Sequence, residues 1–323
     1  MAQSTWEVAE PGKLLFDQPV TELNVRVVNG TVNVVGTDED SARLEVSRLE
    51  GPPLVVTREG SSLTVAYADL HWTGWLKWLD RKGWQRDVVV SLAVPAEAAV
   101  RIGVVGAGAV ISGIRGTTSV HSVSGDATLV RLTGSVRAET VSGSLEAQSV
   151  TGALRYESVS GDLTVIEGGA GSPVRAESVS GDMLIDLAET DGADPPGPTD
   201  VRLATVSGEL AIRLPDRTDA DVEVNTTSGP VSNAFGDLRV TGRWGAKKIT
   251  GTLGAGTGTL RASTMSGSIA LLRRPSDEDG PAGGDDPAAG DDPAGGADPA
   301  AGGPGDSDGP ASTATGGPTG KVL

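Results

Sequence analysis

Glycine recurs at a strict interval of nine residues through the middle of this 323-residue chain. Alternate members of the series, and glycines further along, lie in a tetrapeptide that reads Val-Ser-Gly-Asp or a close variant of it. A fixed short period is typical of repeat architectures, in which one small unit stacks on the next. The series is Gly116, Gly125, Gly134, Gly143, Gly152 and Gly161, and the tetrapeptides lie at 123–126, 141–144, 159–162, 179–182, 206–209, 227–230 and 265–268.

Apolar residues follow each tetrapeptide glycine at fixed positions. Residues two apart lie on one face of a β-strand, so these columns predict a buried strand face in every repeat. One repeat cannot bury its own apolar row, but stacked repeats at a strand spacing of about 4.8 Å can. The first column is Ala127, Leu145, Leu163, Met183, Leu210, Val231 and Ile269; the second is Leu129, Ala147, Val165, Ile185, Ile212, Asn233 and Leu271.

The predicted fold is therefore all-β, a right-handed β-helix or β-solenoid with roughly 18–20 residues per coil. Successive coils are expected to stack in chain order, with parallel strands in register. Each corner glycine is expected to adopt a backbone conformation that β-branched residues avoid. The Val before it and the Leu after it are expected to point into the core. The corner glycines are Gly125, Gly143, Gly161, Gly181, Gly208, Gly229 and Gly267.

The chain divides into three predicted regions. Residues 1–110 form a β-rich N-terminal region, with strands at 21–28, 31–35, 43–48, 54–58, 63–67 and 87–94. Asn29-Gly30 predicts a turn between two paired strands, and residues 59–62 predict a second hairpin. Residues 111–275 hold the solenoid repeats, with residues 188–200 looped out. Residues 276–323, rich in Pro, Gly, Ala and Asp, form an acidic tail that we expect to be disordered.

Composition excludes several functions. The net charge is −17, which disfavours a nucleic-acid partner because phosphate neutralisation needs a basic surface. Cysteine is absent, which excludes disulfides and thiol chemistry. The N-terminal residues do not resemble a signal peptide, and no stretch is apolar enough to span a bilayer. The expected location is cytoplasmic, with peripheral membrane association as an alternative.

Two polar columns accompany the repeat. Asp126, Asp162, Asp182 and Glu209 share one corner position, and they fit turn-forming acids better than a calcium site, which needs several acids per repeat. Hydroxyl residues flank the Val and are interpreted as outward strand columns and corner caps, with a glycan-recognition stripe as the alternative. Those before the Val are Ser122, Thr140, Ser158, Ser178, Thr205, Thr226 and Thr264. The two histidines, His71 and His121, are interpreted as ordinary surface residues, so no catalytic, metal or cofactor site is predicted.

The segment 72–84 holds four of the six tryptophans, namely Trp72, Trp75, Trp78 and Trp84. Tryptophan beside Lys and Arg at helical spacing is typical of an interfacial amphipathic helix. A cap over the open apolar end of a solenoid is the preferred interpretation, since solenoids need such caps.

The repeated units ETVSGSL, ESVSGDL, ESVSGDM and TVSGEL resemble a bacterial putative-adhesin family of β-strand-repeat proteins, over roughly residues 20–272. The resemblance implies a β-helix-type fold and no catalytic residues. The favoured function is a non-enzymatic scaffold or binding protein with a protein, glycan or membrane-surface partner. Self-assembly through the solenoid ends is a further expectation. The alternatives are a carbohydrate-active β-helix enzyme, which requires acids clustered on one face, and a membrane-surface accessory of an envelope-stress system.

Overall fold

The computed structural model describes residues 3–68, 86–169, 171–189, 197–243 and 245–274. Within these ranges the chain is all-β, with 26 strands in two mixed sheets and no helix. The Trp segment 72–84, most of the predicted loop 188–200, and the tail 276–323 lie outside the described residues.

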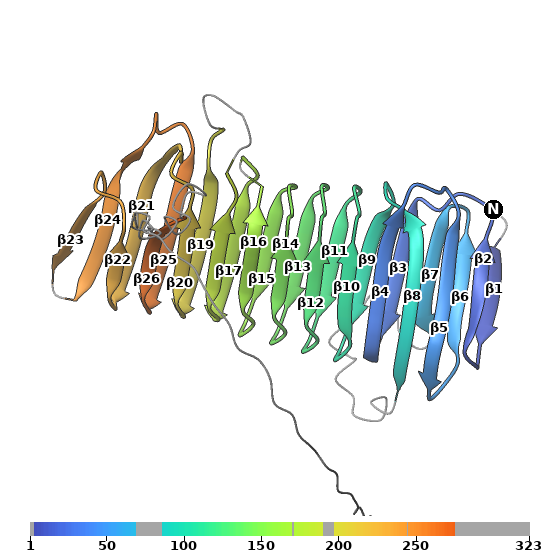
Figure 1. Cartoon of the computed structure of the whole chain (residues 1–323). Helices are drawn as coiled ribbons and strands as arrows, with labels where there is room; N and C mark the ends of the chain where they lie inside the picture. The colour runs from blue at the N-terminus through green and yellow to red at the C-terminus, as the bar shows by residue number, and fades with distance from the viewer. Residues whose placement is uncertain (1–2, 69–85, 170, 190–196, 244, 275–323) are drawn as a thin grey trace, which may run out of the picture. The chain divides into compact units, whose positions relative to one another are not determined.

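The larger sheet, called sheet A here, has 14 strands that stand in a row in Figure 1. In spatial order they are β1 (Gln3–Val8), β6 (Leu54–Glu59), β7 (Ser62–Tyr67), β3 (Glu22–Val27), β9 (Ala99–Val104), β11 (Thr118–Ser122), β13 (Val136–Thr140), β15 (Leu154–Ser158), β17 (Val174–Ser180), β19 (Asp200–Ser207), β25 (Thr259–Ser266), β21 (Ala220–Ser228), β24 (Ala246–Leu253) and β23 (Arg239–Arg243).

The second sheet, sheet B, has 12 strands. In spatial order they are β2 (Gly12–Phe16), β5 (Ala42–Glu50), β8 (Asp87–Pro95), β4 (Asn29–Thr37), β10 (Gly108–Ser112), β12 (Ala127–Val130), β14 (Leu145–Gln148), β16 (Leu163–Gly168), β18 (Met183–Leu187), β20 (Leu210–Leu214), β26 (Ile269–Arg273) and β22 (Val231–Asn233).

Consecutive strands alternate between the two sheets from β9 to β20, and neighbours within a sheet are parallel over this stretch. Ala109, Ala127, Leu145 and Leu163 are successive register partners in sheet B, each 18 residues after the last. The next step, to Met183, takes 20 residues and includes a register shift. The nine-residue spacing of the sequence is therefore half of one complete passage through both sheets.

Both sheets contribute to one continuous apolar core. The two predicted apolar columns are buried on sheet B, with the exception of the partly buried Val231 and the polar Asn233. The matching rows of sheet A, including Val136, Ala138 and Tyr156, are buried as well. Period-two alternation thus identified the inward faces correctly in both sheets.

The N-terminal strands correct one prediction and confirm another. Asn29-Gly30 does not join two paired strands, because β3 belongs to sheet A and β4 to sheet B. Gly30 instead passes close to a neighbouring strand, where a Cβ would lie 1.9 Å from the Val88 carbonyl oxygen. The predicted hairpin at 59–62 is present, since β6 and β7 pair antiparallel with Glu59 opposite Ser62. Neither sheet is interrupted at the boundary between residues 110 and 111, because β9 pairs with both β3 and β11.

The C-terminal strands depart from the predicted chain order. β25 lies between β19 and β21 in sheet A, and β26 lies between β20 and β22 in sheet B. The last coil in sequence is thus inserted before the preceding one. The prediction of parallel neighbours in the repeats is also wrong at the C-terminal end, where β24 pairs antiparallel with both β21 and β23. In the N-terminal region, β6 pairs antiparallel with both β1 and β7.

Candidate functional site

The repeat tetrapeptides form a corner that connects a strand of sheet A to the next strand of sheet B. Each corner glycine lies directly against the glycine of the neighbouring coil. A Cβ on Gly143 would lie 2.1 Å from the Gly125 carbonyl oxygen, and a Cβ on Gly161 would lie 2.1 Å from the Gly143 carbonyl oxygen. The contact recurs at Gly181, Gly208, Gly267 and Gly229. Glycine is therefore required by close backbone approach.

This finding corrects the predicted reason for the corner glycines. Among the seven, only Gly229 has a φ in the left-handed half of the map, at 155°. The left-handed position belongs to the opposite corner, where it is held by Gly113, Arg131, Ser149 and Glu167 at 18-residue spacing. Coil stacking, and not turn conformation, explains the recurring glycine.

The other corner residues bind the neighbouring coil. The Asp126 carboxylate accepts a hydrogen bond from the Ser144 backbone N–H at 2.9 Å, and the Asp162 carboxylate accepts one from the Asp182 N–H at 2.9 Å. The Ser142 hydroxyl donates to the Val123 carbonyl oxygen in the preceding coil. These acids hold successive coils together, which supports the structural interpretation of the Asp column.

The hydroxyl column and the Val column exchange the orientations predicted for them. Ser122, Ser178 and Thr205 are buried, and the Ser158 hydroxyl accepts a hydrogen bond from the Gly161 backbone N–H at 2.7 Å. The residues that follow are not buried as predicted: Val159, Val179, Val206 and Met265 are exposed, whereas Val141 is half-buried and Val123 is partly buried and packs against the core. We call this column the valine ridge, and it consists of Val123, Val141, Val159, Val179, Val206 and Met265.

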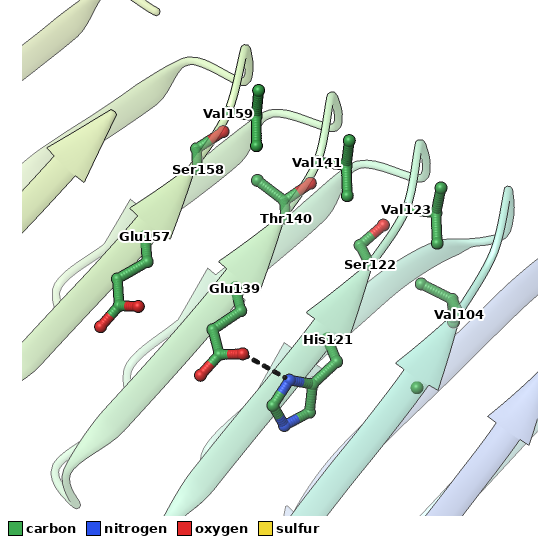
Figure 2. A pocket seen from close by; sticks show the side chains of 11 residues that line it. Val104, His121, Ser122, Val123, Glu139, Thr140, Val141, Glu157, Ser158 and Val159 are labelled. Atoms are coloured by element: carbon green, nitrogen blue, oxygen red, sulfur yellow. Dashed lines mark ion pairs between the residues drawn. The ribbon is translucent and has the colours of Figure 1, made fainter. Parts of the chain in front are cut away.

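The valine ridge borders a groove of about 410 Å³ at the ends of β9, β11, β13 and β15. Figure 2 shows Val123, Val141 and Val159 along one side and His121, Glu139 and Glu157 on the other. Between them lie Ser158, Thr140 and Ser122, and the buried Val104 continues that middle column as the register partner of Ser122. The lining residues are Gly103, Val104, His121, Ser122, Val123, Glu139, Thr140, Val141, Glu157, Ser158 and Val159. The groove thus has one apolar wall and one acidic wall.

The acidic wall belongs to an ordered array of ion pairs on the outer face of sheet A. Glu139, Glu157 and Glu177 stack in register, and each pairs with the Arg two residues earlier on its own strand. These side chains are 36–51% exposed, so each pair contributes at most about 1 kcal/mol. The signal was present in the sequence, because Arg-x-Glu recurs at 137–139, 155–157 and 175–177.

Glu139 is the member of this array that contacts both an Arg and a His, namely Arg137 and His121. Partial burial by itself raises its pKa, but the hydrogen bond from Arg137 and the neighbouring His121 outweigh burial and hold the pKa below its ordinary value. His121 Nδ1 lies 3.3 Å from a Glu139 carboxylate oxygen, and His121 Nε2 lies 3.1 Å from the Ser119 hydroxyl. Residues 121 and 139 lie one 18-residue coil apart, so the repeat period held a signal for this contact. Sequence reasoning missed it because His121 is interpreted there as an ordinary surface residue.

The order Ser119, His121, Glu139 matches the sequence of contacts in a nucleophile–base–acid triad. A hydrolytic triad also needs donors aimed at the oxyanion of the tetrahedral intermediate. The strand that carries Ser119 and His121 is paired on both edges, with β9 and β13, so its backbone N–H groups are committed to the sheet. The geometry is better suited to holding the groove wall in place than to acyl transfer.

Other predicted sites are not brought to this groove. No group of three or more His, Asp or Glu side chains with metal-binding geometry occurs in the described part of the chain. His71 and the four predicted Trp residues lie outside it. Across the ranges that can be described, no helix is long and apolar enough to cross a bilayer.

Neither a family model nor a curated protein matches this chain. Among solved structures, it is similar to a putative cell adhesion protein from Clostridium sporogenes. The likeness covers 82% of this chain and 100% of that chain, at 10% sequence identity and a TM-score of 0.25. Agreement at this level carries no inference about ligand or activity.

Proposed function

We propose that this chain is a non-enzymatic β-solenoid scaffold that binds a macromolecular partner at the valine ridge and its groove. The solenoid part of the proposal is supported by the alternation of strands between sheets A and B and by the 18-residue return to each sheet. Because crossovers between parallel strands are almost always right-handed, we propose a right-handed β-helix.

The exposed valine ridge is the observation that carries the binding proposal. Val159 and Val179 are each 50% exposed, Val206 is 45% exposed and Met265 is 59% exposed. They occupy neighbouring coils, so their exposed surfaces form one continuous stripe. Contiguous apolar surface on a soluble protein marks sites of contact with other molecules. In the adhesin-like form of the proposal, the partner is a protein or glycan of another surface.

The alternative of a carbohydrate-active enzyme finds less support. Glycoside hydrolysis uses two carboxyl groups, one of them a general acid with a raised pKa. The sheet acids do lie on one face, but Glu139, Glu157 and Glu177 are each paired with an Arg, and the pKa of Glu139 is lowered. This pattern favours stabilised surface charges over catalytic acids.

Site-specific photocrosslinking in the native cell tests the binding proposal. A photoreactive residue at position 159 or 179 should give discrete adducts. The control is position 110 on sheet B, whose Val is 39% exposed outside the ridge and groove. Equal adducts at all three positions, or none at the ridge, would contradict the proposal.

A turnover screen tests the absence of enzymatic activity. Purified protein should release no product from polysaccharides or from activated esters. Turnover that disappears in Glu139→Gln or Ser119→Ala, with the melting temperature retained, would overturn the non-enzymatic interpretation.

A further inference from the structure

We propose that the valine ridge and groove bind an amphipathic α-helix with basic flanks, about four turns long, supplied by a partner protein. This inference rests on the proposed function and names the chemistry of its partner. Three properties of the surface carry it: the length of the apolar stripe, the spacing of its members, and the charges on either side.

The apolar stripe has defined ends. Beyond Val123 the corresponding residue is Val105, which is buried, and beyond Met265 it is Thr227, which is polar. The six apolar residues lie on successive coils and span five strand spacings, or about 24 Å at about 4.8 Å each. Val159, Val179, Val206 and Met265 are the exposed members, and Val123 and Val141, at one end, are partly buried. A helix of about 16 residues has that length, at 1.5 Å per residue.

The spacing favours a helix over an extended strand. A helix laid along the ridge presents one apolar face per turn, at about 5.4 Å, which is close to the coil spacing of about 4.8 Å. An extended strand presents same-side residues only about every 6.6 Å. This spacing is longer than the coil spacing of about 4.8 Å, so successive same-side residues of a strand would not lie opposite successive coils. Helix-in-groove recognition uses anchors at i, i+3, i+4 and i+7, which this surface can receive.

Carboxylates line the ridge on its corner side. Asp126, Asp162, Asp182 and Glu209 each lie three residues beyond a ridge member and are exposed. Asp126, Asp162 and Asp182 each use one oxygen to bind the next coil's backbone N–H. No ion pair joins these four acids to a cation in the described ranges, so their charge is available to a ligand.

The other side of the ridge is also acidic at its inner margin. The Glu139, Glu157 and Glu177 column lies closer to the ridge than the Arg column behind it, because the Arg residues come two positions earlier on each strand. At the coils of Val159 and Val179, cationic side chains on both flanks of an apolar helix face would therefore meet carboxylates on both sides, and those of the Glu column are shared with Arg.

The groove lacks features that other ligands require. Its lining holds no aromatic side chain on which a sugar ring could stack. The charge of the whole chain, −17, opposes approach to an anionic lipid surface. Of the macromolecules considered, a basic amphipathic helix fits both the apolar stripe and its charges.

Peptide binding to the full-length chain tests the proposal. The probe is an 18-residue Leu/Lys peptide with leucine at i, i+3, i+4 spacing, and its affinity is measured by isothermal titration calorimetry. One control peptide scrambles the same residues, and a second replaces Lys with Glu. We expect the amphipathic basic peptide to bind at least about tenfold more tightly than either control, since one well-placed apolar anchor contributes a factor of that order.

Matched variants locate the binding. Val159→Asp with Val179→Asp should weaken binding of the peptide at least about tenfold, because both side chains lie on the ridge. Val110→Asp adds one carboxylate to the outer face of sheet B and should leave binding unchanged, whereas each of the two ridge substitutions made singly should weaken it. Because all three positions are 39–50% exposed, folding should survive, and circular dichroism checks it. Equal binding of the scrambled peptide, or no loss in the ridge variant, would overturn the proposal.

Two results separate this inference from the proposed function. Ridge-specific photocrosslinks without peptide binding would mean that the ridge has a partner of another chemistry, and this inference alone would be wrong. If the ridge gives neither crosslinks nor peptide binding, both are wrong. Peptide affinity that falls as salt is raised would support the charge argument.

Discussion

At the scale of single residues, the recurring glycine and the left-handed backbone conformation occur at different corners of each coil. The glycine lies in the tetrapeptide corner, and the left-handed residue lies in the opposite corner. The recurring glycine lies where two backbones touch, as at Gly161, whose Cβ would lie 2.1 Å from the Gly143 carbonyl oxygen. The left-handed position is occupied in three coils by residues with side chains, among them Arg131 at a φ of 53°. Such a residue costs about 1–2 kcal/mol relative to right-handed backbone.

Substitutions at the two corners should therefore have opposite signs. Gly161→Ala forces neighbouring coils apart and should lower the free energy of unfolding by at least about 1–3 kcal/mol. Arg131→Gly should leave it unchanged or raise it by up to about 1 kcal/mol. Gly108→Ala is the matched control, since nothing lies within 4 Å of its Cβ. Urea denaturation measures all three, and equal destabilisation by Gly161→Ala and Gly108→Ala would contradict the close-approach argument.

Tyr156 is a buried residue whose ionisation should lower the stability of the protein at alkaline pH. Burial is the main cause that raises its pKa from 10.0 to about 12, with the nearby Asp162 adding to it and a hydrogen bond with Ser158 opposing it. Its hydroxyl donates to the Asp162 carbonyl oxygen at 3.1 Å. Because the pKa is raised in the folded state, this stabilisation is complete below about pH 10 and is lost as the pH rises through about 12.

We expect stability to fall in that alkaline window in the native chain and to fall less in Tyr156→Phe. At neutral pH the same variant should be about 1 kcal/mol less stable, because it loses one buried hydrogen bond. Denaturation midpoints measured from pH 8 upward check both effects. Parallel curves for the two proteins above pH 10 would show that Tyr156 does not control the alkaline loss.

At the scale of elements, the pairing of β25 decides how the C-terminal part is held. β21 has two partners in sheet A, β24 on one edge and β25 on the other, and β25 lies between it and β19. Direct contact between the two coils is limited to their starts, where the Thr199 N–H donates to the Asp219 carbonyl oxygen at 3.0 Å. Strands β21, β23 and β24 therefore depend on a strand that comes after all of them in the sequence. Local sequence patterns identify each of these strands. They do not predict which strand, distant in sequence, each one pairs with.

Truncation should expose this dependence. A chain that ends at residue 255 lacks β25 and β26, and we expect the amides of β21, β23 and β24 to lose their protection from hydrogen exchange. A chain that ends at residue 275 keeps both strands and should keep that protection. Retained protection in the shorter chain would show that β21 can pair directly with β19.

At the scale of the whole molecule, charge and packing are unevenly distributed along the chain. Residues 276–323 contain ten acids and one base, which gives −9 of the net −17. Their Pro, Gly, Ala and Asp composition offers little apolar surface to bury. Removing them should change the melting temperature by only a degree or two, measured by scanning calorimetry at moderate salt. A larger drop would show that this tail contributes to packing.

The sequence alone determined the all-β character, the 18-residue spacing and most of the buried columns. These follow from alternation and period, which are local properties of the chain. Only the tertiary structure decided the position of β25 and the outward direction of the exposed members of the valine ridge. Each depends on pairing between residues distant in sequence or on how the backbone turns at a corner. The repeat thus predicts what is buried, whereas the stacking of coils determines which surface is left to bind.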